Sequence, residues 1–216
     1  MSDAVRVVHM DELDRIDAAG GVFLPIRRRL GVRAFGVNAY TARAAGDQVI
    51  ERHNELGAGA GRHEELYLVL SGRAEFTVSG EVVDAPAGTF VFVPELEAER
   101  AAVAREPDTT VLVIGGPAAA PLPTSPFEYW FAAEPAYRAG DYDGAVTIAS
   151  AGLREWPGHP VINYQLACYH ALAGRSDQAL EHLATAVTGE PRAAEWAAGD
   201  SDFDSIRADP AFPPPP

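Results

Sequence analysis

Hydrophobic residues along the first half of the chain gather in short segments of five to eight residues, in the manner of β-strands. Between Val32 and Ile114, short β-branched and aromatic segments are separated by glycine or proline. Several such segments in near-regular succession predict an antiparallel sandwich or barrel. Before Val32 an amphipathic stretch indicates a lead-in or an edge strand. The strand segments are VRAFGVNAYTA, GDQVIERH, EELYLVLSG, AEFTVSG, GTFVFVP and TTVLVIGG.

Beyond Pro126 the hydrophobic spacing changes to a helical period, and the sequence repeats itself. A period of 34 residues is typical of the tetratricopeptide helix pair, and it predicts two such pairs, at about 126–157 and 160–191. Two repeats rarely bury a continuous core alone, so we expect residues 192–212 to form a helical cap. Three residues recur as identical pairs at this interval: Gly140 and Gly174, Ala145 and Ala179, and Pro157 and Pro191.

The change of pattern divides the chain into two domains of different class. Four prolines lie within residues 115–126, a density that supports neither a helix nor a central strand and therefore predicts a linker. The expected organisation is a β-barrel domain with its lead-in at 1–116, a linker at 117–126, an all-α helical-repeat domain at 127–212 and a tail at 213–216.

Composition and charge narrow the classes of function. The net charge of −14 argues against nucleic acid as a partner, because phosphate contacts need clustered basic residues. The one basic run, Arg27 to Arg29, is interpreted as a solvated loop or a salt-bridge partner. Cys168, the single cysteine, excludes an internal disulfide and lies on a helix face predicted to be buried. No apolar run is long enough to span a membrane, so we expect a cytoplasmic protein.

The segment EELYLVLSGRAEFTVSGEVVDAPAGTFVFVPE resembles the cupin family, small double-stranded β-helix (jelly-roll) barrels whose interior can hold a metal or a small ligand. The resemblance rests on Glu65, six residues and Gly72, and then on Gly88, five residues and Pro94. It covers about residues 32–116. The resemblance implies a cupin-like barrel, and because cupin barrels commonly pair through their sheets it also implies a homodimer.

The metal ligands of cupin enzymes are only partly present. The family typically offers an H-x-H pair, the glutamate and a third histidine, since a divalent metal needs three or four ligands. On this chain the H-x-H positions fall on Ala58 and Ala60, and the position of the third histidine falls on Glu99, with Arg100 beside it. The resemblance therefore leaves only Glu65 in the expected set.

Other polar residues nearby form a candidate ligand pocket. Alternate residues of a strand share a face, so His63, Glu65 and Tyr67 should point together into the barrel. If the glycine-rich LGAGAGR is an insertion, His53 joins them as part of a shifted pair. His53, His63 and Glu65 are then the candidate metal ligands; alternatively, His63 and Glu65 form an internal hydrogen-bonded pair and His53 lies on a surface loop. The full pocket set is Glu51, His53, His63, Glu65, Tyr67 and Glu99.

We favour a non-catalytic, degenerate cupin that binds a small molecule, with the helical module serving oligomerisation or partner binding. One alternative is a metal-dependent isomerase, epimerase or dioxygenase in which Tyr67 donates a proton. Another is a pure protein-interaction scaffold. The aromatic residues of the helical half are interpreted as core packing, with a peptide groove as the alternative: Trp130, Trp156, Tyr164 and Trp196.

Overall fold

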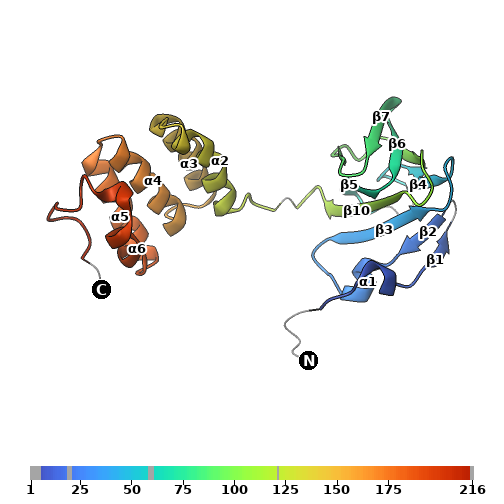
Figure 1. Ribbon diagram of the computed structural model, residues 1–216, viewed down its shortest axis with the longest axis horizontal. Coiled ribbons are helices and arrows are strands. Elements are labelled where there is room, and N and C mark those ends of the chain that lie inside the picture. Colours follow the sequence, from blue (N-terminus) through green and yellow to red (C-terminus); the bar gives the residue numbers. More distant parts are fainter. Residues whose placement is uncertain (1–5, 19–20, 58–60, 121, 215–216) are drawn as a thin grey trace. The chain divides into compact units, whose positions relative to one another are not determined.

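The computed structural model covers the whole chain, and the residues described below are 6–18, 21–57, 61–120 and 122–214. The chain forms two compact units, Met1–Pro121 and Leu122–Pro216 (Figure 1). The first unit contains all the β-strands and the second is helical. The predicted fold class, a β-barrel domain followed by an all-α domain, is confirmed. The boundary between the units lies inside the proline-rich segment at 117–126.

The β unit is built from two antiparallel sheets. The six-stranded sheet has the order β1-β2-β3-β10-β5-β8 and the four-stranded sheet the order β4-β9-β6-β7. A short helix, α1, follows β2. The elements are β1 (Ile16–Ala18), β2 (Gly21–Leu24), α1 (Ile26–Leu30), β3 (Gly36–Ala42), β4 (Gln48–His53), β5 (His63–Ser71), β6 (Arg73–Val78), β7 (Glu81–Pro86), β8 (Phe90–Val93), β9 (Arg100–Ala104) and β10 (Thr110–Pro117).

The core of this unit lies between the inner faces of the two sheets. Tyr67 and Val69 of β5 pack there with Phe76 of β6 and Val111 of β10, all nearly or completely buried. Inner residues alternate with outer ones along each strand, as expected for a closed double-sheet barrel. The sequence analysis missed β9, because its alanines give no strong strand signal.

The lead-in differs in part from the expectation. β2 pairs with β3 as an additional strand, but the segment after it forms the short helix α1 and no strand. Leu13, Val22 and Leu24 pack with Ala39 in a small second core on the outer face of the six-stranded sheet. The arginine run lies on α1, exposed, and makes no ion pair within the described ranges.

The helical unit contains two antiparallel helix pairs and a cap. Gly140 and Gly174 follow the first helix of each pair with φ of 75° and 73°, a left-handed conformation that only glycine adopts without strain. Ala145 and Ala179 are fully buried, which explains why these positions repeat as alanine. The helices are α2 (Pro126–Arg138), α3 (Tyr142–Glu155), α4 (Pro160–Leu172), α5 (Ser176–Gly189) and α6 (Ala193–Gly199).

The cap completes the helical core as expected from the shortness of the array. Phe203 and Ile206 are buried against the helix pairs, and Phe203 makes an edge contact with Tyr164 at a ring-centroid distance of 5.5 Å. Cys168 lies in the same core, where burial raises the pKa of its thiol well above the usual value. Within the described residues no helix is long and apolar enough to cross a membrane.

The first prediction concerns Gly72, which joins β5 to β6 with a φ of 71°. A Cβ on this residue would lie 2.4 Å from Thr109 Oγ1, whereas a Cβ on Gly80 (φ 89°) meets nothing within 4 Å. Gly80→Ala should therefore cost about 1 kcal/mol of unfolding free energy from backbone strain alone, and Gly72→Ala about 2–3 kcal/mol.

Urea unfolding followed by circular dichroism measures this difference. Tryptophan fluorescence is the internal reference, because Trp130, Trp156 and Trp196 all lie in the helical unit. Equal losses of stability in the two variants would contradict the role given to the close contact with Thr109.

Candidate functional site

Two residues of β5 bring polar groups into the interior of the barrel. Glu65 and Tyr67 both point inward and are 8% and 1% exposed. The Tyr67 hydroxyl donates a hydrogen bond to Glu65 Oε2 at 2.5 Å. Burial, with the charge of Glu65, raises the pKa of Tyr67 far above the usual range, so its hydroxyl stays protonated and acts as a donor.

His53 reaches the same carboxylate from the end of β4. Its Nε2 lies 3.3 Å from Glu65 Oε2, and its Nδ1 lies 2.7 Å from the carbonyl oxygen of Glu51. Both ring nitrogens therefore face acceptors. Only the protonated imidazolium carries a hydrogen on each nitrogen and can donate to both acceptors. The hydrogen bond with Glu65 raises the pKa of His53, although burial opposes the shift.

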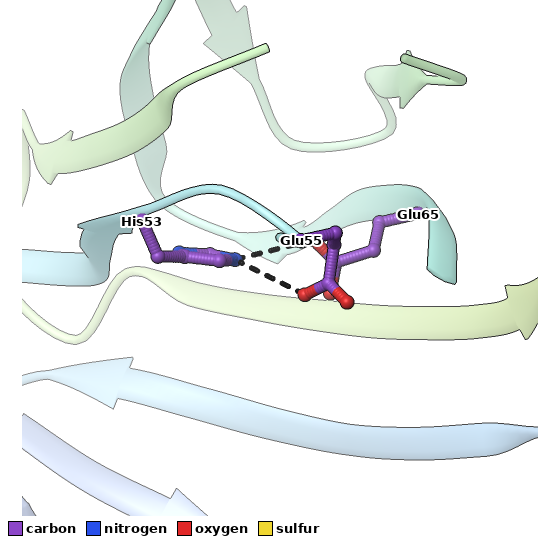
Figure 2. A group of neighbouring side chains, drawn as sticks. All are labelled: His53, Glu55 and Glu65. Carbon is purple, nitrogen blue, oxygen red and sulfur yellow. Dashed lines mark hydrogen bonds and ion pairs between the residues drawn. The ribbon is translucent and has the colours of Figure 1, made fainter. Parts of the chain in front are cut away.

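Glu55 is a member of the site that the sequence analysis missed. It follows β4 and is 6% exposed, and its Oε2 accepts the backbone N–H groups of Gly61 and His63, each at 3.0 Å. Its Oε1 lies 3.9 Å from His53 Nε2. Figure 2 shows the His53 ring pointing between the two carboxylates of Glu55 and Glu65. The Glu55 carboxylate therefore fixes the backbone at the start of β5 as well as facing His53.

Arg100, at the start of β9, is the second residue missed. It is fully buried, and its Nε lies 3.4 Å from Glu65 Oε2. None of its three guanidinium nitrogens makes a hydrogen bond to a described residue. The sequence analysis placed Glu99 in the pocket, but Glu99 is exposed and pairs with Arg52 on the outside. Adjacent residues of a strand point to opposite faces of the sheet. An inward position placed one residue too early therefore selects Glu99 in place of Arg100.

Charges within this group balance one another. Two carboxylates, Glu55 and Glu65, face two cationic groups, Arg100 and protonated His53. Burial alone would raise the pKa of Glu65, but the hydrogen bonds from His53 and Tyr67, with the charges of His53 and Arg100, hold it below its usual range. We call these five residues the buried polar cluster: His53, Glu55, Glu65, Tyr67 and Arg100.

The cluster does not fit a resident divalent metal. The only ligand-like group among the described residues of the barrel is His53, Glu55 and Glu65, whose ligand atoms lie within 4.8 Å of one another. However, Glu65 Oε2 is already shared by Tyr67, His53 and Arg100. The Arg100 guanidinium already supplies, next to the Glu65 carboxylate, the positive charge that a metal ion would bring. No unbalanced negative charge is therefore left for a metal ion to neutralise.

A cavity of about 300 Å³ opens beside the cluster. Its wall combines the polar atoms of Glu65, Tyr67 and His53 with apolar strand residues. This volume lies at the lower end of the range for small-molecule sites. The residues that line it are Tyr40, Val49, Ile50, Glu51, His53, Glu55, Glu65, Tyr67 and Val113.

A second cavity of about 550 Å³ shares Tyr40, Glu65 and Val113 with the first. It is lined by His63 and by two exposed arginines, Arg27 and Arg33. Neither arginine has an acidic partner in the part of the chain that the structure describes. A positive wall is therefore present at this end of the site, although the chain as a whole carries a net charge of −14.

The six residues predicted from the sequence thus separate into three groups. His53, Glu65 and Tyr67 meet in the cluster, while Glu51 lines the inner cavity and His63 the outer one. Glu99 lies outside, as described above. Glu65 is paired with His53 and not, as in the alternative interpretation, with His63. Ala58 and Ala60 lie outside the described residues.

Comparison with known proteins follows the division of the chain. Residues 136–199 match the family model described as a tetratricopeptide repeat, which confirms the predicted repeat character of the helical unit. A search of curated proteins finds no match.

Solved structures similar to this chain include cupins. One is a cupin protein from Bacteroides fragilis, at 20% identity over 52% of this chain and 91% of that chain, with a TM-score of 0.40. Another is a cupin-superfamily sugar phosphate isomerase from Silicibacter pomeroyi (17% identity, 51% and 75% coverage, TM-score 0.43). A third is the nucleoside dehydratase Pac13 from Streptomyces (16%, 53% and 83%, TM-score 0.40). The isomerase and dehydratase activities are those of these similar proteins.

The second prediction is that Glu65 sets the protonation of His53. Glu65→Gln removes the charged hydrogen-bond acceptor, so the pKa of His53 should fall toward its ordinary value of about 6.5. NMR titration of the His53 ring measures it, and Glu64→Gln, which changes the adjacent residue, is the matched control. An unchanged His53 titration in Glu65→Gln would rule out the pairing.

The same pair makes stability depend on pH. The pKa of His53 is raised on folding, so its contribution is complete below about pH 6.5 and is lost as pH rises through the folded pKa. The pKa of Glu65 is lowered, so its contribution is complete above its unfolded value of 4.5 and is lost as pH falls through the folded pKa. The contribution of the pair is therefore greatest between those two values.

Proposed function

We propose that the β unit binds a small hydroxylated molecule in the barrel, without a metal, and that the helical unit serves association with other chains. The observation that carries the proposal is the buried polar cluster, four of whose members, His53, Glu55, Glu65 and Tyr67, line the inner cavity. An imidazolium, a phenol and two carboxylates give donors and acceptors at fixed positions. Such a preorganised set recognises a polyhydroxylated ligand, because each hydroxyl can both donate and accept.

Arg100 supports the proposal through Glu65, because Arg100 lines neither cavity whereas Glu65 lines both. A fully buried guanidinium without hydrogen bonds is costly. Its Nε lies 3.4 Å from Glu65 Oε2, so the guanidinium keeps a charged acceptor at a fixed position on the cavity wall.

The outer cavity indicates the charge of the ligand. Arg27 and Arg33 line it without acidic partners, and Glu65 lies on its wall as well as on that of the inner cavity. A molecule that places hydroxyl groups near Glu65 and an anionic group near the two arginines would use both cavities. Arginine binds carboxylate and phosphate through charge-assisted, often bidentate hydrogen bonds. We therefore propose a hydroxylated carboxylate or phosphate as the ligand.

The helical unit is proposed as an association module because it exposes aromatic side chains. Phe127 and Phe131 of α2 and Trp196 of α6 are 49%, 64% and 41% exposed. Tyr164, in contrast, is buried, and Trp156 donates a hydrogen bond from Nε1 to the Thr124 carbonyl oxygen. The four aromatic residues singled out in the sequence are therefore not all core residues, and aromatic side chains are enriched at protein interfaces.

The third prediction tests the metal-free site. Protein purified without added metal should contain well below one equivalent of any transition metal, measured by plasma mass spectrometry. Its unfolding midpoint should not rise when Zn²⁺ or Mn²⁺ is added. Arg100→Met removes one of the two internal cations and should gain affinity for these ions, since one negative charge of the two carboxylates is then no longer balanced. Stoichiometric metal in the wild type, lost in Glu65→Gln, would instead favour the metal-dependent enzyme.

The fourth prediction tests the ligand class. In a panel of sugar acids and sugar phosphates with their uncharged counterparts, such as gluconate with sorbitol, the anionic members should bind more tightly by calorimetry. Arg27→Gln should weaken their binding about tenfold, the value of one charge-assisted hydrogen bond. Arg28→Gln, on the same helix but not part of the cavity wall, is the control. Equal affinities for charged and uncharged members, or equal effects of the two variants, would contradict the arginine role.

A further inference from the structure

A pocket of about 680 Å³ lies in the helical unit, and the function proposed above does not use it. Its wall comes from α2 and α4, the first helices of the two helix pairs, and from α6 with the residue after it. The volume is within the range of small-molecule sites. The residues that line it are Phe127, Trp130, Val161, Tyr164, Gln165, Trp196, Gly199 and Asp200.

Aromatic side chains from all three helices form much of this wall. On α2, the rings of Phe127 and Trp130 have centroids 6.1 Å apart and are tilted by 36°. Tyr164 of α4 and Trp196 of α6 meet edge to face, with centroids 5.7 Å apart and an interplanar angle of 80°. The face of an aromatic ring carries partial negative charge and attracts a cation placed over it.

The one charged residue of the wall is acidic. Asp200 directly follows α6, and its Oδ2 accepts a hydrogen bond from the Tyr164 hydroxyl at 2.9 Å. The thiol of Cys168 lies 3.8 Å from the same oxygen, and the backbone N–H of Asp202 donates to Oδ1 at 3.0 Å. These donors fix the direction of the carboxylate, but none of them is a cation.

Nearby charged groups leave this carboxylate unbalanced. Arg207 donates to the backbone carbonyl oxygen of Asp200, but its ion pair is with Asp204. A second acid, Asp202, lies close by, and burial together with the charge of Asp200 raises its pKa. Among the described residues, no basic side chain forms an ion pair with either Asp200 or Asp202. A cation in the pocket would therefore relieve the repulsion between two acids.

The indole of Trp196 is held in place by groups outside the pocket. The guanidinium carbon of Arg192 lies 5.8 Å from the centroid of its ring, and Arg192 is itself paired with Glu190. With the edge contact from Tyr164, this stacking fixes the ring before any ligand arrives. Such preorganisation reduces the entropy lost on binding.

We propose that this pocket binds a small organic ammonium ion that carries alkyl groups on its nitrogen. Aromatic faces together with a carboxylate attract a cation, and recognition of alkylated ammonium groups is the use to which such aromatic walls are best suited. An inorganic cation would need several oxygen ligands. Of the ligand-like group Cys168, Asp200 and Asp202, only Asp200 lines the pocket.

This site is separate from the two roles proposed above. It does not depend on the ligand of the barrel, which we propose to be an anion. It assigns Phe127 and Trp196 to ligand binding, whereas Phe131, which is 64% exposed and not part of the pocket wall, remains available for association with other chains. Failure of one proposal therefore leaves the others standing.

Calorimetry with the full chain tests the charge of the ligand. Choline and 3,3-dimethyl-1-butanol have the same shape, but the alcohol has a carbon atom in place of the charged nitrogen. At equal ionic strength, choline should bind at least about tenfold more tightly, because only the cation gains from the rings and the carboxylate. Equal affinities for the two compounds, or no binding of choline, overturn the proposal.

Two matched pairs of variants locate the binding. Asp200→Asn keeps an acceptor oxygen for the Asp202 N–H but removes the charge, and it should weaken choline binding about tenfold. Glu195→Gln removes one charge from α6 outside the pocket wall and should have no effect. Phe127→Ala should weaken choline binding, whereas Phe131→Ala, on the same helix, should not.

Circular dichroism checks that each variant keeps the helical fold, and the phenylalanine pair decides the matter if Asp200→Asn does not. Choline binding that changes equally within each pair overturns the assignment to this pocket. Nα-acetyl-trimethyllysine amide carries the same cation on a peptide backbone. If it binds more tightly than choline, the ligand is a modified protein chain, and the assignment to a small molecule is overturned.

Discussion

The burial of Arg100 is the constraint on which the rest of the barrel interior depends. A guanidinium with no exposed surface carries a large desolvation cost, which must be offset by acids and acceptors in contact with it. Glu65 supplies the nearest charge, and Glu65 in turn holds Tyr67 and His53. Removing Glu65 leaves the buried guanidinium without its nearest counter-charge. The polar wall of the inner cavity is thus organised from the arginine outward.

This organisation also connects the site to the local architecture. Glu55 links His53 to the backbone of Gly61 and His63, so the start of β5 is held by the cluster it helps to form. The four-stranded sheet contributes His53 and Arg100, and the six-stranded sheet contributes Glu65 and Tyr67. The polar contacts therefore join the two sheets across the apolar core. The ligand recognition that we propose and the integrity of the barrel would depend on the same few side chains, which limits how freely either can change.

Much of the fold could be predicted from the sequence, because it follows from short-range rules. Short β-branched and aromatic segments bounded by glycine and proline identified most strands. The repeated glycines and alanines located both helix pairs, whose left-handed turns and tight packing require those residue types. Alternation along β5 also placed Glu65 and Tyr67 on one inner face. β9 was missed because small alanines fill its inner positions, where the facing strand supplies the bulk.

The composition of the site was harder to predict, because it depends on register and on loop conformation. Arg100 and Glu99 differ by one position, and only the strand pairing shows which of them points inward. Glu55 lies after a strand end, where no periodic pattern applies, and its role arises from backbone N–H groups several residues away. The sequence around Arg100 carries no alternating pattern that could have shown that it points inward, because residues 101 to 104 are all apolar.

The buried position of Cys168 has a practical consequence for studying the protein. It is the only thiol in the chain, it lies in the core of the helical unit, and burial together with Asp200 and Asp202 disfavours its thiolate. Alkylating reagents attack the thiolate, so modification requires the helical core to open first. The rate of thiol labelling thus reports the opening free energy of one unit alone. The natural chain carries a built-in reporter that separates the stability of its two halves without any engineered label.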